Sequence, residues 1–363
     1  MWNLKNWKIM EILLDELYKI DLTCNHYVER KLQLDEQSYQ IVGIAQSGKS
    51  ELVKAYLLTC KKNSYLYIDL DDIRIEIDEL NLHLQDFCTK NKISILVLDN
   101  YSPEVKTVNV SQLIVCSRKY VEIDFLITKR LTPLDFEEFL AFESRYDSTA
   151  ISHYLQLGGF AAMHKISSDN RAKYIQEKFR YALSPLEFDI LVTATKSLGQ
   201  KLSAFNIYEK LKAKRKISKD MLYKTFESML QDGYLFALSK LGFPSATKKI
   251  YLCDIIFKST LTIQKNFARV FENIVFLELL KGDYEFFYEE GIEFYIPQKS
   301  EVILCMPFAE ERIMFKKLES IEAFIFSNQV QKITCVTMSK EGEISHPISK
   351  VEMLPFSQWA LGD

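Results

Sequence analysis

One stretch of the chain has residue types and spacing that suit phosphate binding. Residues 43–50 read GIAQSGKS and match the pattern G-x-x-x-x-G-K-[ST] in full. Glycines in such a loop let backbone N–H groups turn toward phosphate oxygens, and the N-terminus of the following helix adds partial positive charge at the same point. The apolar run QIVG precedes the loop and a helical segment follows it, which is the required context. We therefore expect a phosphate-binding loop here.

The side chains of this loop have distinct expected roles toward a nucleoside triphosphate. Lys49 would reach the β and γ phosphates, and Ser50 would place its hydroxyl on Mg²⁺, whose other ligands are mostly water and phosphate oxygens. The residues expected to contact the nucleotide are Gly43, Gln46, Ser47, Gly48, Lys49, Ser50 and Glu51. The sequence thus predicts ATP and Mg²⁺ as cofactors.

Later apolar runs end in polar residues that could complete this site. The run ILVLD ends at Asp99, a carboxylate expected to orient Mg²⁺; the alternative is an aspartate that only starts a turn. The run QLIVCS ends at Ser117, whose hydroxyl could sense the γ-phosphate. Arg118 and Arg130 are each a candidate arginine finger, acting within one subunit or on a neighbouring one, or else surface arginines.

Composition excludes several classes of protein. The 363 residues are 48% apolar and 26% charged, with only 11 Gly and 8 Pro, which disfavours disordered, collagen-like and turn-rich all-β chains. A net charge of −3 excludes a chain that is basic throughout but permits a local basic face. Because no apolar run approaches the roughly 18 residues of a membrane span, and the first residues are too charged for a secretory signal, we expect a cytoplasmic protein without membrane contact.

The seven cysteines are scattered and are read as reduced thiols.

The order of the predicted elements indicates an α/β fold. An amphipathic helix is expected up to about residue 25, with Ile9, Ile12, Leu13, Leu17 and Ile20 near helical spacing. Short apolar runs then alternate with helical stretches, which predicts a parallel sheet with crossover helices. The expected elements are strands at 38–43, 64–69, 93–99 and 111–117 and helices at 49–60 and 72–90.

In this order, the motifs resemble archaeal-type ATPases of the AAA+/STAND branch of P-loop proteins. The motifs that carry the resemblance are the loop at 43–50, YIDLDDIR at 67–74, the strands ending at Asp99 and Ser117, Arg130, LTPLDFEEFL at 131–140 and YLQLGGF at 154–160. The resemblance covers about residues 39–160. It implies a P-loop sheet domain followed by a winged-helix domain and a nuclease-like domain of the PD-(D/E)XK type. We therefore expect parts at 1–36, 37–160, 161–265 and 266–363.

The residue after Asp99 departs from the AAA+ pattern. AAA+ ATPases usually carry a glutamate there that polarises the attacking water, but this chain has Asn100, whose amide cannot accept a proton. Slow hydrolysis, or binding without turnover, is the expectation unless Asp69, Asp71 or Asp72 supplies the base. The candidate catalytic residues are Lys49, Asp99, Asn100, Ser117 and Arg130.

The middle of the chain resembles a winged helix. Residues 202–238 read as a helix, a turn, a recognition helix and the start of a wing, with YLCD at 251–254 as the returning strand. From Lys196 to Lys224 the chain has nine Lys or Arg residues and only two acidic residues. The residues expected to hold the phosphates of duplex DNA are Lys212, Lys214, Arg215, Lys216, Lys219 and Lys224. The alternative is a lid or spacer whose lysines only face solvent.

In the last part, the resemblance implies a degenerate nuclease fold. Active relatives place a glutamate on the first helix, an aspartate on a strand and Glu-x-Lys on the next strand; Glu272 and Glu293 stand at the first two places. The third place, that of Glu-x-Lys, falls on VILCMPF. There Cys305 and Pro307 or their neighbours stand in place of the glutamate and the lysine. We predict no cleavage of phosphodiesters.

Three functions remain open on the sequence. The first is a nucleotide-driven switch that acts on a DNA- or protein-binding module. The second is a nucleic-acid-binding protein whose P-loop is structural. The third is a protein-interaction scaffold, or a homo-oligomer, with an aromatic-rich tail, although the alternating spacing of those aromatics favours a core. They are Phe271, Phe276, Phe286, Phe287, Tyr288, Phe294 and Tyr295.

Overall fold

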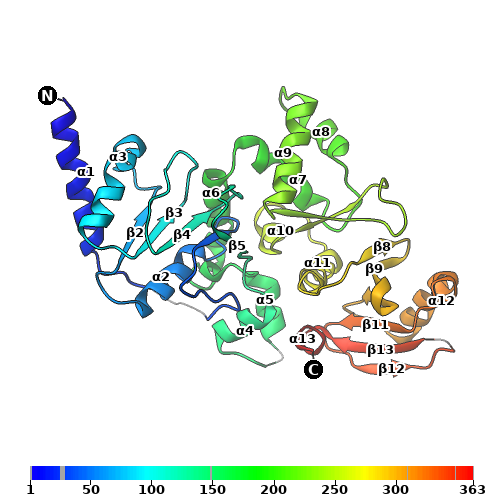
Figure 1. The fold of residues 1–363 in the computed structure, drawn as a ribbon. Helices are drawn as coiled ribbons and strands as arrows, with labels where there is room; N and C mark the ends of the chain where they lie inside the picture. The colour runs from blue at the N-terminus through cyan, green and yellow to red at the C-terminus, as the bar shows by residue number, and fades with distance from the viewer. Residues whose placement is uncertain (1, 25–28, 148, 309, 348, 363) are drawn as a thin grey trace. The chain divides into compact units, whose positions relative to one another are not determined.

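The computed structural model describes every residue except 1, 25–28, 148, 309, 348 and 363 (Figure 1). The chain divides into two compact units, residues 1–133 and residues 134–363. Helices α4 (Phe136–Glu143) and α5 (Ala150–Leu157), expected at the end of the sheet domain, lie in the second unit. The finer four-part division stays a prediction.

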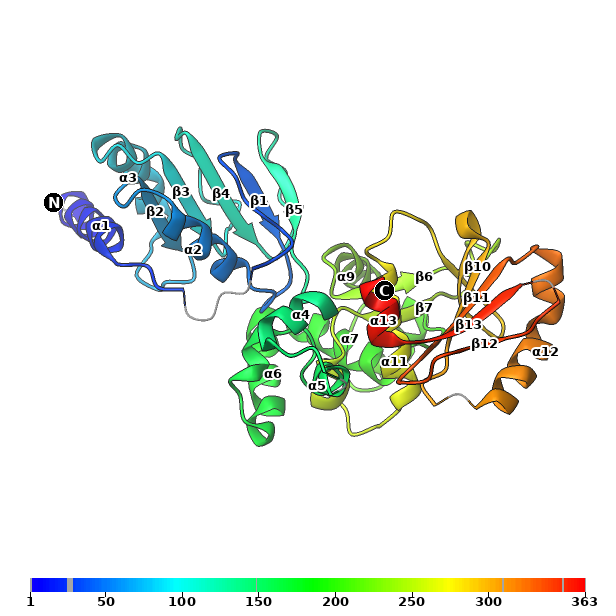
Figure 2. The ribbon, with the colours of Figure 1, turned by 90° about the horizontal axis from the view of Figure 1, so that it is seen from below.

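The first unit contains a five-stranded parallel sheet in the order β2-β3-β4-β1-β5 (Figure 2). The strands are β1 (Tyr39–Val42), β2 (Tyr65–Asp69), β3 (Ile95–Asp99), β4 (Gln112–Ser117) and β5 (Ile127–Arg130). In the register, Asp69 is opposite Asp99, and Val42 is opposite both Ser117 and Arg130. This confirms the predicted α/β parallel sheet and places the carboxyl ends of all five strands at one edge.

Helices cover both faces of this sheet. On one face, α1 (Trp2–Lys19) and α3 (Ile77–Lys90) pack against strand residues such as Leu66, Leu98 and Val115. On the other face, α2 (Lys49–Thr59) buries Leu52, Val53 and Leu57 against the sheet. Helix α3 begins at Ile77 rather than near Asp72, because the preceding residues form turns at the carboxyl edge.

The helical face predicted for α1 is partly wrong. The buried residues are Met10, Leu13 and Leu14, whereas Ile9 and Ile12 are more than 60% exposed. Helical spacing was present in both sets of apolar residues, and the position of α3 decides which of them is covered.

The second unit begins with helices and a two-stranded antiparallel sheet. After α4 and α5, the helices are η1 (Ala161–His164), α6 (Ser168–Ala182), α7 (Pro185–Lys196), α8 (Ala204–Lys212), α9 (Lys219–Gln231) and α10 (Ile256–Thr260). The sheet pairs β6 (Leu235–Leu238) with β7 (Lys249–Leu252). These elements match the helices and returning strand expected between residues 202 and 254.

A six-stranded mixed sheet forms the rest of the second unit, in the order β12-β13-β11-β10-β9-β8. The strands are β8 (Phe287–Glu289), β9 (Ile292–Ile296), β10 (Glu301–Cys305), β11 (Lys332–Thr337), β12 (Gly342–Ile344) and β13 (Lys350–Pro355). Its helices are α11 (Phe267–Leu279), the 3-10 turn η2 (Pro297–Lys299), α12 (Glu311–Ser327) and α13 (Phe356–Leu361). The sequence did not indicate α12, α13, β12 or β13.

The aromatic-rich tail is mostly core. Phe271, Phe276, Tyr288, Phe294 and Tyr295 are each at most 5% exposed. All seven cysteines are free thiols. Across the described ranges, no helix has the length and apolar character needed to cross a membrane.

Candidate nucleotide-binding site

The loop at residues 43–50 joins β1 to α2 and requires glycine at both ends. Gly48 has φ +95°, in the left-handed region that side chains disfavour. At Gly43, a Cβ atom would lie 2.3 Å from the Leu131 carbonyl oxygen and 2.7 Å from Ser47 Oγ. Gln46 is also left-handed, with φ 67°. The loop therefore takes the tight path that the sequence pattern predicts.

Lys49 places a buried cation against this loop. Its Nζ donates to the carbonyl oxygens of Gly43 at 2.7 Å and Ile44 at 3.0 Å, and the residue is 7% exposed. Burial lowers the pKa of Lys49, while the nearby charge of Asp99 acts in the opposite direction. No carboxylate of the described chain lies within ion-pair distance of Nζ, so a bound anion would supply the missing charge.

Two serines of the loop differ in their surroundings. Ser47 is 3% exposed, and its Oγ is buried without a hydrogen-bond partner among the described residues. A buried hydroxyl without a partner is suited to donate to an oxygen atom of a ligand in the loop. Ser50 is half-buried in the first turn of α2. The Glu51 carboxylate accepts from Cys24 Sγ at 3.2 Å and pairs with Lys54.

Asp99 is held rigidly at the carboxyl edge of β3. It is 1% exposed; Oδ2 accepts from the Tyr67 hydroxyl at 2.5 Å, and Oδ1 accepts from the Asn100 backbone N–H at 2.9 Å. Burial, followed by the charge of Asp99, raises the pKa of Tyr67 far above its usual range. The phenol therefore stays a donor to Asp99 at all physiological pH values.

The side chain of Asn100 is bonded to the neighbouring strand. Asn100 has φ 53°, and its Nδ2 donates to Asp69 Oδ1 at 2.9 Å. Asp72 is bound by the Arg74 guanidinium and backbone, which lower its pKa. Burial raises the pKa of Asp71, and the charges of Asp69 and Asp99 add to this effect while Arg118 opposes it. A role of Asp69, Asp71 or Asp72 as the base stays a prediction.

The other predicted residues lie along the same edge. Ser117 is buried, and its hydroxyl donates to the Lys119 carbonyl at 2.7 Å. Arg118 Nη2 lies 3.9 Å from Asp71 Oδ2, and Arg130 is exposed at the end of β5. The structure thus brings Lys49, Asp99, Asn100, Ser117 and Arg130 to one edge of the sheet, while their catalytic roles stay predictions.

Sequence reasoning missed one residue at this loop. Arg30 is 6% exposed and lies in the segment before β1; its Nη1 donates to the Ser47 carbonyl at 2.9 Å and its Nη2 to the Thr132 carbonyl at 2.7 Å. A lone arginine outside any regular element carries no periodic signal, so only the folded contacts identify it.

The basic residues of α8 and α9 divide into paired and exposed groups. Lys212 pairs with Glu209, and Arg215 pairs with Asp189, each at 2.7 Å. Lys219 Nζ lies 5.5 Å from the ring centroids of both Phe205 and Tyr223. The remaining predicted contacts, Lys214, Lys216 and Lys224, are exposed to solvent.

The acidic residues expected at the nuclease-like site are neutralised by basic partners. Glu272 is 3% exposed and accepts from the Tyr251 hydroxyl at 2.6 Å, from Lys249 Nζ at 3.2 Å and from Arg269 Nη1 at 2.5 Å. Glu293 pairs with Lys317 at 3.2 Å. Within the described part of the chain no group of three or more His, Cys, Asp or Glu residues is arranged to hold a metal ion.

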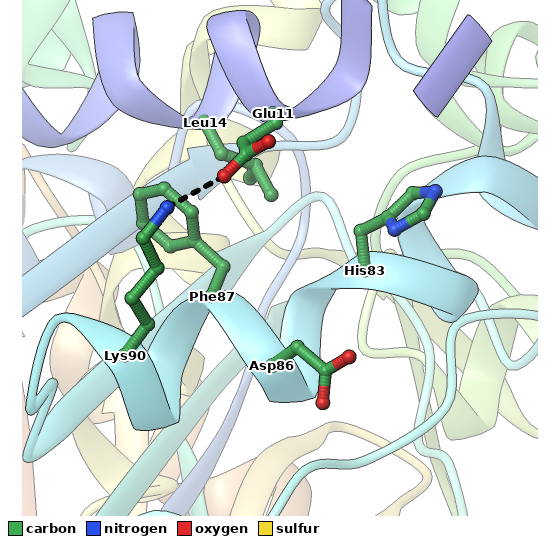
Figure 3. Close-up of a pocket in the computed structure, with 6 residues that line it drawn as sticks. All are labelled: Glu11, Leu14, His83, Asp86, Phe87 and Lys90. Atoms are coloured by element: carbon green, nitrogen blue, oxygen red, sulfur yellow. Dashed lines mark hydrogen bonds and ion pairs between the residues drawn. The ribbon is translucent and has the colours of Figure 1, made fainter. Parts of the chain in front are cut away.

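A small pocket of about 230 Å³ lies between α1 and α3 (Figure 3). Its lining residues are Glu11, Leu14, His83, Asp86, Phe87 and Lys90, and Glu11 and Lys90 form an ion pair at 2.7 Å. These α3 residues lie between the middle and the end of the helix, and the end leads to the start of β3 rather than to the carboxyl edge. No residue of the phosphate loop lines this pocket.

Comparison with known proteins gives distant similarities. No protein-family model matches the sequence. An uncharacterized protein of Methanocaldococcus jannaschii is 24% identical, over 97% of this chain and 94% of that protein. The Walker-type ATPase of Pyrococcus abyssi is similar in structure, with a TM-score of 0.41 and 14% identity over 71% of this chain and 94% of that one. The Aeropyrum pernix ORC1 protein, solved in complex with DNA, has a TM-score of 0.30 and 9% identity over 71% of this chain and 91% of that one.

Proposed function

We propose that this protein binds ATP with Mg²⁺ at the loop of residues 43–50 and Asp99. The observation that carries the proposal is a complete phosphate loop between β1 and α2, in which the buried Lys49 ammonium is held by carbonyl groups alone and the buried Ser47 hydroxyl has no partner in the described chain. Asp99 lies at the same edge of the sheet.

The residues present fit both groups. Backbone N–H groups of the loop and the N-terminus of α2 would bind the β and γ phosphates, and Lys49 would add a positive charge. Ser50 and Asp99 supply hard oxygen atoms, which Mg²⁺ prefers. Mg²⁺ would neutralise phosphate charge, and the chain's own part is to orient the phosphates and exclude water from the buried side of the loop.

Turnover is slow in this proposal, and binding itself is the functional event. The Asn100 amide cannot take a proton from water, and its Nδ2 is bonded to Asp69. Nucleotide binding would then bias the protein between conformations, as in a switch.

Unfolding measurements with and without MgATP test the binding proposal. At about a hundred times Kd, MgATP should raise the free energy of unfolding of the first unit by roughly 2.7 kcal/mol. Lys49→Ala should abolish this gain, while Lys62→Ala, at an exposed lysine paired with Asp21, should preserve it. Equal melting of the wild type with and without MgATP would remove the proposal.

A second candidate function is nucleic-acid binding by α8 and α9. The observations that favour it are the exposure of Lys214 and Lys216, between α8 and α9, and of Lys224 in α9, and the position of Lys219 near the rings of Phe205 and Tyr223. In this proposal α7 to α9 with β6 and β7 form a winged helix, and residues 266–363 form a degenerate nuclease-like domain.

Salt dependence tests this second function. If about four phosphates are neutralised, the logarithm of the affinity for duplex DNA should fall with the logarithm of salt concentration at a slope near −3.6. Reversing the charges of Lys214, Lys216 and Lys224 should flatten the slope, whereas Lys265→Glu, at another exposed lysine, should leave it unchanged. Retained binding by the triple variant would assign the contact to another surface.

A further inference from the structure

Arg30 connects the phosphate loop to the segment that follows β5. Its guanidinium donates through Nη1 to the Ser47 carbonyl and through Nη2 to the Thr132 carbonyl. The Leu131 N–H donates to the Val42 carbonyl at 2.8 Å, and Gly43 packs directly against the Leu131 carbonyl. Residues 131 and 132 therefore form a fixed support on which Arg30 holds the loop.

The bond to Ser47 fixes the direction of a neighbouring donor. The peptide bond between Ser47 and Gly48 is planar and trans, so the Gly48 N–H points opposite to the Ser47 carbonyl. Arg30 draws the carbonyl toward itself, and Nη1 lies 3.4 Å from the position a Gly48 Cβ would occupy. The Gly48 N–H is thereby turned away from Arg30, and no acceptor in the described chain bonds to it.

We propose that Arg30 is a positioning residue that orients the Gly48 N–H for binding the triphosphate chain of the nucleotide. This inference rests on the proposed function. Arg30 acts through the peptide plane and does not itself touch the phosphates. A guanidinium suits this role because its planar fork donates to two carbonyl groups at fixed angles, which a lysine ammonium on a flexible stem does not reproduce.

The opposite orientation of the Ser47–Gly48 peptide would weaken the binding of phosphate by the loop. Without the guanidinium, the Ser47–Gly48 peptide is free to rotate, since Gly48 accepts a wide range of backbone angles. A rotated peptide presents a carbonyl oxygen to the phosphates and removes one donor from them. The effect on affinity should equal the loss of a hydrogen bond to a charged group, about tenfold.

Calorimetric titration of the full chain tests this role, with MgATP and inorganic tripolyphosphate as ligands. Tripolyphosphate has no base or sugar, so it reports on the phosphate-binding part of the site alone. We expect Arg30→Met and Arg30→Lys each to weaken both ligands by about tenfold. The control Arg312→Met, at an exposed arginine of α12, should bind as the wild type does.

Each outcome of this titration either supports or overturns the positioning role of Arg30. Wild-type affinity in Arg30→Lys together with a loss in Arg30→Met would show that only the charge counts, which overturns the positioning role. Unchanged affinity in both variants overturns it as well. If Arg30→Met does not fold, Arg30→Lys alone decides, with hydrogen exchange of the peptide spanning residues 43–50 as the second measurement: MgATP should protect this peptide in the wild type and protect it less in the variant. Failure of the wild type to bind either ligand would overturn the proposed function, and this role with it.

Discussion

At the level of single residues, the polar groups of the candidate site are held by partners from other strands. Asp99 of β3 is bonded to Tyr67 of β2, and Asn100 is bonded to Asp69 at the end of β2. Such contacts limit side-chain motion before any ligand arrives, which reduces the entropy that binding must overcome. The site is therefore largely preformed on the β2–β3 side.

The position of Asn100 leads to a prediction on catalysis. Asn100→Glu should increase phosphate release at least tenfold, because a carboxylate close to Asp69 and Asp99 is expected to have a raised pKa and to act as a general base. A phosphate-release assay with saturating MgATP measures the rate. The double variant Lys49→Ala, Asn100→Glu is the control, and it should show no gain. An Asn100→Glu protein that binds MgATP without faster release would mean that the site lacks more than its base.

Asp254 leads to a prediction on pH dependence. Burial raises the pKa of Asp254 to about 7, against the opposing effect of hydrogen bonds from the backbone N–H groups of Ile256 and Gly159. The folded state therefore holds this proton up to a higher pH than the unfolded chain, so the contribution is present at low pH and is lost as pH rises through about 7.

The difference between wild type and Asp254→Asn isolates this group. Between pH 5 and pH 8 the free energy of unfolding of the wild type should fall relative to that of the variant by roughly 2 to 3 kcal/mol. Urea unfolding at both pH values measures it, with Asp220→Asn, at an exposed aspartate of α9, as the control. A constant difference across this range would mean that Asp254 is already ionised at pH 5 in the folded protein.

At the level of elements, the end of α5 is joined to the start of α10 by one close contact. Gly158 has φ +67°, and a Cβ atom there would lie 2.1 Å from Asp254 Oδ1. The adjacent Gly159 N–H donates to Asp254 Oδ2 at 2.7 Å, so the carboxylate cannot move aside without losing this bond. Gly158 of YLQLGGF is thus required by a tertiary contact as well as by the helix end.

A pair of glycine variants shows how much Gly158 is required. Gly158→Ala and Gly233→Ala both place alanine at positive φ, but Gly158 also has ψ −167°, which essentially only glycine adopts, and a Cβ at Gly233 would meet nothing within 4 Å. Gly233→Ala should cost about 1 kcal/mol, and Gly158→Ala should cost about 2 kcal/mol more because of the clash with Asp254 and this backbone conformation. Urea unfolding of both variants measures the difference, and equal costs would contradict the contact with Asp254.

At the level of the whole molecule, the phosphate loop and the basic helices belong to different compact units. Residues 1–133 contain the loop, and residues 134–363 contain α8 and α9. A switch requires that nucleotide binding in the first unit alters the second, whereas a protein that only binds nucleotide does not.

Hydrogen exchange followed by mass spectrometry distinguishes these cases. MgATP should slow exchange in peptides that contain residues 43–59 and 95–100, because binding suppresses local opening. The switch proposal predicts that exchange also changes in peptides beyond Leu134, and Lys49→Ala serves as the control that should show neither change. If the effect stops at Pro133, the switch proposal is wrong and the binding proposal stands.

The sequence alone determined the features that depend on short-range chemistry. The loop, the strands that end at Asp99 and Ser117, and α2 each follow from neighbouring residues: glycines permit the left-handed turn, and runs of apolar residues form buried strands. Because parallel strands end at one edge, these predictions also brought the candidate residues together. Local pattern and tertiary fold agree here.

Only the tertiary structure decided which contacts join distant segments. It selected Met10 and Leu14, beside the expected Leu13, rather than Ile9 and Ile12 as the buried face of α1, and it brought Arg30 to Ser47 and Thr132. Both outcomes depend on elements that lie far apart along the chain, and an amphipathic pattern or a lone arginine does not name its partner. Packing resolves such choices because burying one apolar face, or satisfying one buried guanidinium, is favourable only when the complementary surface is already in place.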